Sequence, residues 1–268
     1  MDKIPIWIIF GATILIVMAT IELGFRVGRA AHHRSEDEKE SPVSAIEAAV
    51  LGLLAFILAF TFGMVSDHYD TRKALVRDEA SAIRTAWLRS DFLPEPSRSE
   101  AIALLKKYLD IRLAAVQSGD IKELQKILPE TVKIQHRLWE IATVNAGRDL
   151  NSDVAALYIE SLNEVINIHA LRISMGMQIR LPISIWVVLY ALIMLGMFLV
   201  GYHSAIAASR RSWAKPILAI SFSLVIVLIL MLDRPDSGYL PVTQQPLINL
   251  QSMMNGGFEA NPTHPQNP

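Results

Sequence analysis

The chain alternates between long apolar runs and stretches in which apolar and charged positions recur with a helical period. Four runs are long and apolar enough to cross a hydrocarbon core, which takes about 20 helical residues. They cover residues 4–23, 43–65, 181–201 and 217–232. We therefore predict four transmembrane helices, of which the last is short.

The second apolar run continues into the longest regular feature of the sequence. From residue 66 it becomes a charged helical pattern that contains neither Gly nor Pro up to residue 91. Residues 42–91 are consequently predicted to form one helix about 70 Å long, at about 1.5 Å per residue. Half of this helix would lie in lipid and half in water. The reverse arrangement is predicted later, where the polar helix 151–180 leads into the third span.

The central segment, residues 66–180, is predicted to be helical throughout. Val76, Ala80, Ile83 and Trp87 recur at spacings of three and four, which places them on one helix face. Three further amphipathic patterns follow, and the third helix of the segment is predicted to be interrupted near Pro129. Four amphipathic helices with short links favour an antiparallel bundle.

The predicted fold class is therefore all-α. It is a polytopic membrane protein with four spans and an extramembrane helical bundle that is continuous with the second and third spans. The predicted domains are a first transmembrane hairpin (1–65, with the loop 24–41 between its spans), the bundle (66–180), a second hairpin (181–232) and a C-terminal tail (233–268). The tail is rich in Pro and Gly. We expect it to be irregular, and disordered from about residue 255.

The distribution of Lys and Arg predicts the orientation in the membrane. Seven basic residues lie in the two hairpin loops, against one in each terminal segment. The positive-inside rule then places the loops in the cytoplasm. We expect a multi-pass protein of the bacterial inner membrane, with both termini and the bundle outside the cytoplasm. The first span is predicted to be a retained anchor, because no cleavage site follows it.

Composition and motifs exclude several classes of function. The net charge of −1 gives no field that would attract nucleic acid, and the absence of cysteine removes thiol chemistry. Nucleotide-binding, metalloprotease and hydrolase motifs are missing. We therefore expect no enzyme, no cofactor and no metal. His32-His33 is interpreted as a solvated pair, and His169 with Arg172 as a satisfied polar group near a helix core.

Two carboxylates lie inside or at the edge of the apolar runs, Glu22 and Glu47. An ionisable group in a span is by default a functional hypothesis. Both positions are close to the predicted cytoplasmic surface, within reach of Arg26 or Arg29. Ion or proton handling and simple ion pairing at the membrane surface are therefore both open.

The second span carries an apolar stripe formed by Gly52, Phe56, Phe60 and Met64, each four residues after the last. In a symmetric oligomer such a stripe can form a hydrophobic constriction that gates by dewetting. The alternative is that it packs on neighbouring helices, with Gly52 allowing a close approach.

Several segments resemble a bacterial membrane family called bestrophin-like, whose activity is not assigned. They are Gly24-Phe25-Arg26 with Gly28-Arg29, LAFILAFTFGM at 54–64 with the His68-Tyr69-Asp70 and Arg72 that follow, DEASAIRTAWLRSDFLP at 78–94, and LDRPDSGYLPVTQQPL at 232–247. The third segment contains Glu79, Arg84 and Thr85, just beyond the membrane on the long helix. These three residues are interpreted either as a ligand site at a vestibule or as contacts between helices.

A looser resemblance is to the bestrophin anion channels, pentamers whose second membrane helix lines a hydrophobic neck. This resemblance implies a homo-oligomer in the lipid bilayer, pentameric by analogy, that conducts an inorganic ion. Two departures are that the basic loops predict the opposite orientation, and that no acidic calcium clasp is evident, unless residues 233–236 are a remnant of one.

Two functional hypotheses follow. In the first, the protein is an oligomeric ion channel whose second span lines the pore. In the second, it is a membrane-anchored sensor or scaffold whose bundle binds a ligand or a partner protein outside the cytoplasm.

Overall fold

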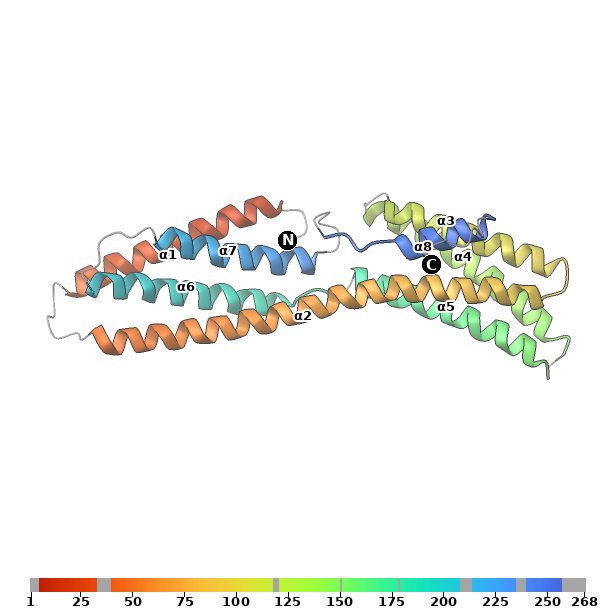
Figure 1. Cartoon of the computed structure of the whole chain (residues 1–268), viewed down its shortest axis with the longest axis horizontal. Coiled ribbons are helices and arrows are strands. Elements are labelled where there is room, and N and C mark those ends of the chain that lie inside the picture. Colours follow the sequence, from red (N-terminus) through yellow and green to blue (C-terminus); the bar gives the residue numbers. More distant parts are fainter. Residues whose placement is uncertain are drawn as a thin grey trace, which may run out of the picture. The chain divides into compact units, whose positions relative to one another are not determined.

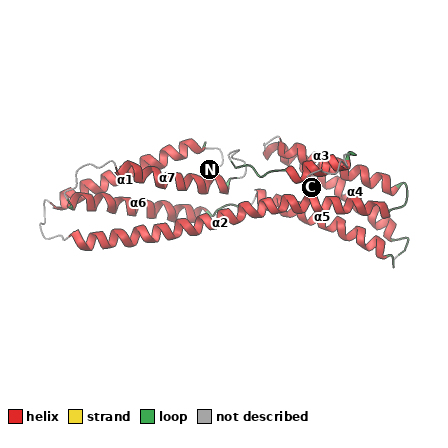
Figure 2. Ribbon diagram, in the orientation of Figure 1, coloured by secondary structure: helices red, strands yellow, loops and turns green. Residues whose placement is uncertain are grey.

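The protein consists of helices joined by short connections. The computed structural model describes residues 5–32, 40–117, 121–149, 151–177, 179–207, 214–234 and 240–256, and Figure 2 shows no strand among them. Along the chain these are α1 (Ile6–His32), α2 (Glu40–Arg89), the 3₁₀ turn η1 (Ser90–Phe92), α3 (Ser97–Gln117), α4 (Ile121–Ala146), α5 (Asp153–Met177), α6 (Ile183–Ile206), α7 (Ala214–Asp233) and α8 (Gln245–Met254).

Four of these helices are long and apolar enough to cross a membrane. The candidate spans are Ile6–Ala31, Pro42–Phe92, Ile183–Ile206 and Lys215–Asp233. The prediction of an all-α protein with four spans is confirmed. The prediction of one long helix from the second apolar run is confirmed as well, because α2 is a single helix of 50 residues.

The chain divides into two compact units. Residues 1–69 and 180–240 form the first, called here the membrane unit, and residues 70–179 and 241–268 form the second, called the bundle unit. The long helix α2 contributes to both.

The membrane unit is held together by a close crossing of α1 and α6 (Figure 1). A Cβ atom added to Gly24 would lie 2.0 Å from the carbonyl oxygen of Phe198, and one added to Gly201 would lie 2.0 Å from that of Ile21. Gly28, one turn after Gly24, meets Tyr202 in the same way. Small residues at such a spacing let two helix backbones come into van der Waals contact. This contact matters in a membrane, because apolar side chains gain little by leaving lipid for a protein interface.

This crossing corrects one prediction. Residues 24–32 were expected in a loop, yet α1 continues to His32. The reason is that Gly24 and Gly28 pack against α6, so the helix stays ordered beyond its apolar run. Residues 33–39 of the predicted loop lie outside the described residues, and its last two residues, 40–41, already belong to α2.

The bundle unit has its own apolar core, to which α2, α3, α4, α5 and α8 all contribute. The predicted face of α2 is buried, with Val76, Ala80 and Ile83 at most 8% exposed. Each helix turns one apolar stripe inward, as expected for helices that stabilise each other by burying apolar surface.

Two predictions about helix continuity are wrong. The helix 151–180 does not continue into the third span, because α5 ends at Met177 and α6 begins only after Pro182. Proline disfavours helical geometry in the residue before it, and the N–H of Leu181 instead donates to the Asp233 carboxylate at 2.9 Å. Conversely, α4 is not interrupted at Pro129 but runs through it, with one hydrogen bond fewer.

The C-terminal tail was predicted to be irregular, which is wrong for α8. Pro246 lies in its first turn, where the missing N–H costs nothing. Leu247, Leu250 and Met254 are 0%, 5% and 4% exposed and belong to the core of the bundle unit. The helix is therefore stabilised by tertiary burial, which local composition does not report. Residues 257–268 lie outside the described residues.

Candidate functional site

The apolar stripe of α2 faces away from the rest of its own chain. Phe56 and Phe60 are 66% and 63% exposed, and nothing lies within 4 Å of a Cβ placed on Gly52. Met64, the last residue of the stripe, is the exception, because it is half-buried and packs against the core of the membrane unit. Packing within one chain therefore does not explain the two phenylalanines, which face lipid or another molecule.

The opposite side of α2 makes the contacts within the membrane unit. Leu54, Leu58 and Val65 are buried, and Leu51 and Leu54 approach Gly196 of α6. Thr61 on this side satisfies its hydroxyl by donating to the carbonyl of Ile57 at 2.7 Å. Within the membrane unit, α2 thus has one face that packs against the chain and, opposite it, an exposed face that carries Phe56 and Phe60.

The two carboxylates of the spans are each paired. Arg26 donates to Glu22 at 3.0 Å, one turn away on α1. Glu47 on α2 lies 2.6 Å from Nδ1 of His203 at the end of α6. The structure therefore brings a histidine to Glu47 that the sequence did not suggest, and joins α2 to α6 through it.

Glu79, Arg84 and Thr85 do not form one cluster. The Glu79 side chain is fully buried in the bundle unit, whereas Arg84 is exposed. The Thr85 hydroxyl donates to the carbonyl of Ser81 at 2.9 Å, within the same helix. The Glu79 side chain, by contrast, accepts hydrogen bonds from side chains of two other helices.

Glu79 is the centre of a buried polar cluster built from three helices. Arg112 of α3 donates from Nε to the Glu79 carboxylate at 2.9 Å, and Arg172 of α5 donates to its other oxygen. The Tyr108 hydroxyl donates to the first oxygen at 3.2 Å. A carboxylate that accepts three hydrogen bonds, two of them from cations, is strongly held in its ionised form.

The cluster extends to His169 on α5. Nδ1 of this ring lies 3.2 Å from the Tyr108 hydroxyl. Because Tyr108 directs its only hydrogen at Glu79, the His169 Nδ1 must carry a hydrogen and donate to Tyr108. Nε2 is then an acceptor, and it has no hydrogen-bond partner among the described residues. Burial, reinforced by the positive charge of Arg112, lowers the pKa of His169 to about 4, so the ring is neutral near pH 7.

Arg172 also connects the cluster to the segment that precedes α8. Its guanidinium donates to the side-chain oxygen of Gln244 at 3.1 Å, and the Gln244 amide donates to the carbonyl of Val242 at 2.9 Å. Burial lowers the pKa of Arg172 to about 10, which still leaves it charged near neutral pH. The cluster thus fastens the C-terminal segment to α2, α3 and α5.

Two open grooves flank this part of α2. One, of about 390 Å³, lies between α2 and α5, and its lining includes Asp78, Thr85, Glu160 and Glu164. The other, of about 260 Å³, lies between α2 and α8 and includes Arg84. Ser81 borders both grooves.

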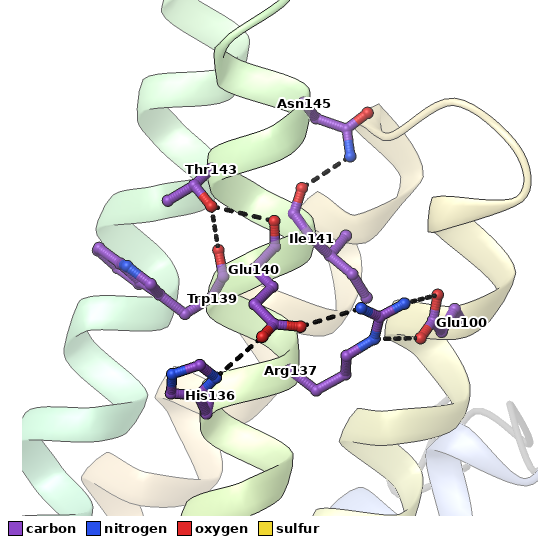
Figure 3. A network of polar contacts seen from close by, with 8 residues as sticks. All are labelled: Glu100, His136, Arg137, Trp139, Glu140, Ile141, Thr143 and Asn145. Atoms are coloured by element: carbon purple, nitrogen blue, oxygen red, sulfur yellow. Dashed lines mark hydrogen bonds and ion pairs between the residues drawn. The ribbon is translucent and has the colours of Figure 1, made fainter.

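A second polar network joins α3 to α4 at the surface (Figure 3). Arg137 makes two hydrogen bonds to Glu100, at 2.6 and 3.1 Å, and a third to Glu140 at 3.0 Å. The hydrogen bond from Arg137 lowers the pKa of Glu140, with a smaller effect of His136 in the same direction. These groups are half exposed, so the network aligns two helices and adds little stability.

The possible metal ligands were also compared with the structure. The described part of the chain contains no group of three His, Asp or Glu side chains arranged to hold an ion. The Asp233 carboxylate instead accepts a hydrogen bond from the Leu181 N–H, and the Arg180 side chain donates a hydrogen bond to the backbone carbonyl of Asp233 at 2.8 Å. Asp236, the other acid of the possible calcium-clasp remnant, lies outside the described residues, as does His33.

Sequence reasoning missed Arg112 entirely. A signal was present, because Arg112 follows Leu105 and Leu109 on an otherwise apolar helix face. A charged residue on a core face needs a buried partner. The sequence does not reveal that this partner is Glu79, which is 33 residues earlier.

These features define a helical membrane protein with four candidate spans. The chain belongs to the bestrophin-like family, because the Bestrophin-like domain model matches residues 13–247. The match runs from α1 to the first turn of α8, so it includes both units. No curated protein and no solved structure matches the chain at a significant level.

Proposed function

We propose that the protein is an ion channel of the bacterial inner membrane, formed by several copies of the chain around an axis lined by α2. One observation carries the proposal: Phe56 and Phe60 lie on a face of α2 that its own chain leaves exposed. Membership of the bestrophin-like family supports it, together with the looser resemblance to the bestrophin anion channels, whose second membrane helix lines a hydrophobic neck.

The physical basis is the behaviour of water in a narrow apolar ring. Phe56 and Phe60 are one helical turn apart, so each copy would contribute two layers of aromatic side chains to the constriction. Such a ring empties of water when narrow and conducts when it widens. Lipid contact is the competing role, and it predicts no dependence of ion flux on these side chains.

Ion flux into liposomes tests the proposal. The purified protein is reconstituted, and flux is compared between the wild type, Phe60→Ala and Leu195→Ala. Leu195 is the matched control, because it is likewise a large apolar side chain that is 58% exposed, but it lies on α6 and not on α2. We expect Phe60→Ala to increase leak severalfold and Leu195→Ala to leave flux unchanged. A monomeric protein without flux, or equal effects of the two variants, would contradict the proposal.

We also propose that both termini and the bundle unit lie outside the cytoplasm. The seven basic residues of the two hairpin loops support this orientation. Alkaline phosphatase fused after residue 268 is expected to be active, and green fluorescent protein fused there to be dark. The opposite pattern would reverse the orientation without affecting the channel proposal.

A ligand-binding role of the bundle is the second candidate. The groove of about 390 Å³ between α2 and α5 favours it. Because three carboxylates line this groove, a polyamine such as spermidine is a suitable probe. A rise in Tm with spermidine that Glu164→Gln abolishes would support this role, with Glu130→Gln on α4 as the control outside the groove. No rise in Tm, or the same rise in both variants, would exclude this ligand-binding role.

A further inference from the structure

The buried cluster around Glu79 carries more positive than negative charge. Its ionised groups are one carboxylate, Glu79, and two guanidinium groups, Arg112 and Arg172. His169 and Tyr108 contribute no charge near pH 7, because burial lowers the pKa of the histidine to about 4 and raises that of the tyrosine to about 12. One positive charge therefore lacks a counter-charge within the cluster.

The neighbouring acids of the described residues do not supply this counter-charge. Asp78 and Glu164 are exposed to solvent on the same helices as cluster residues. Asp110, two residues before Arg112, is also exposed, and its carboxylate accepts a hydrogen bond from the Gln251 side chain at 2.6 Å. The Arg112 side chain, by contrast, is only 5% exposed. An uncompensated charge at that depth is strongly disfavoured, because solvent screens it poorly.

Gln135 on α4 provides a second, independent observation. Its side chain is 8% exposed, and of its two amide N–H groups at most one has an acceptor among the described residues, the Tyr108 hydroxyl. The amide lies beside the Tyr108 hydroxyl, whose pKa both Arg112 and Gln135 lower against the larger effect of burial. Buried N–H donors nearly always have an acceptor. The cluster thus lacks an acceptor where it also lacks negative charge.

We propose that the core of the bundle unit binds one small inorganic anion, of the size of chloride, between the Arg112 guanidinium and the Gln135 amide. The anion accepts hydrogen bonds from both groups and balances the second arginine. This site is separate from the Phe56–Phe60 face, and it does not depend on channel activity.

A water molecule is the competing occupant. Water would accept a hydrogen bond from Gln135 but would leave the positive charge uncompensated. The two occupants differ in one measurable property. Only a bound anion makes the stability of the protein depend on the identity and concentration of the anion in solution.

Thermal unfolding of the full-length protein in detergent tests the proposal. Sodium chloride, sodium bromide and sodium gluconate are compared at equal ionic strength and at pH 7.5. We expect a saturable rise in Tm of about 5 °C with chloride and bromide and none with gluconate, which is too large for the site. Identical Tm values in all three salts would overturn the proposal.

Two variants assign the effect to this site. Gln135→Leu removes the unpartnered donor and is expected to abolish the halide-dependent rise. Gln251→Leu removes an amide on α8 that already has a partner, and it is expected to retain the rise. If both variants keep the rise, the halide binds elsewhere, for example in the pore, and the proposal is wrong.

A spectroscopic measurement covers the case in which Gln135→Leu does not fold. Chloride-35 NMR lines broaden when chloride exchanges with a protein site, and bromide competes for that site. For the wild type, we expect broadening that bromide reverses and gluconate does not. Its absence would overturn the proposal, whereas absent ion flux in liposomes would bear only on the channel.

Discussion

Nε of Arg112 lies 2.9 Å from a carboxylate oxygen of Glu79, and the two side chains are 5% and 0% exposed. This pair connects α3 to the long helix α2 inside the bundle unit. Buried ion pairs contribute little net stability as a whole, yet removing one partner leaves a charge that nothing compensates. The pair therefore fixes which helix faces meet.

Replacing Glu79 is expected to destabilise the protein strongly. Glu79→Gln leaves Arg112 and Arg172 buried without their carboxylate, at an expected cost of about 3–5 kcal/mol in the free energy of unfolding. Denaturation of the purified full-length protein in detergent measures this. The neighbouring exposed acid provides the control, because Asp78→Asn is expected to change stability by less than about 0.5 kcal/mol. Equal effects would show that the buried cluster does not hold the bundle.

The stability of the bundle unit is expected to fall in mild acid because of His169. Its pKa is lowered from 6.5 to about 4 in the folded state. The unfolded chain takes up a proton as the pH falls through 6.5, while the folded chain does so only near pH 4. The contribution is thus fully present above pH 6.5 and lost as the pH falls to about 4, with a total of at most about 3 kcal/mol.

A pH series of unfolding experiments between pH 4.5 and 7.5 checks this prediction. His169→Gln is expected to flatten the pH dependence. His136→Gln is the control, because that ring is 74% exposed and should leave the wild-type slope intact. A slope that is the same in all three proteins would assign the pH dependence to other groups.

The crossing of α1 and α6 is expected to tolerate no side chain at Gly201. A Cβ there would lie 2.0 Å from the Ile21 carbonyl oxygen, so Gly201→Ala must push the two backbones apart. We expect a loss of at least about 1–3 kcal/mol, measured as a lower Tm in detergent. Gly11→Ala on α1 is the matched control, because its Cβ would meet nothing within 4 Å. It is expected to be neutral or slightly stabilising.

Helix α8 is expected to be required for a stable bundle unit. Leu247 is fully buried, so Leu247→Ala should cost about 2–5 kcal/mol. Ile248, the next residue, is 36% exposed, and Ile248→Ala should cost much less. Limited proteolysis reports the difference as faster cleavage of residues 241–256 in Leu247→Ala. Equal cleavage of both variants would mean that the Leu247 side chain does not anchor α8.

Much of the architecture was predictable because the membrane imposes simple rules. Runs of about 20 apolar residues must be helices when no water is available to the backbone, so the four spans follow from hydropathy. The length of α2 was predictable for a similar reason, since its charged half contains no residue that ends a helix before Pro94. Glu22 and Arg26 were predictable as neighbours because four residues make one helical turn.

Only the tertiary structure decided the contacts between distant segments. Glu79 and Arg172 are 93 residues apart, and Glu47 and His203 are 156 apart, so no local pattern pairs them. Helix α8 looked like an irregular tail because its stability comes from the core that buries Leu247. The break between α5 and α6 depends likewise on Asp233, which binds the Leu181 N–H from 52 residues away. Helical period and hydropathy act over a few turns, whereas ion pairs, caps and buried surfaces depend on which helices meet.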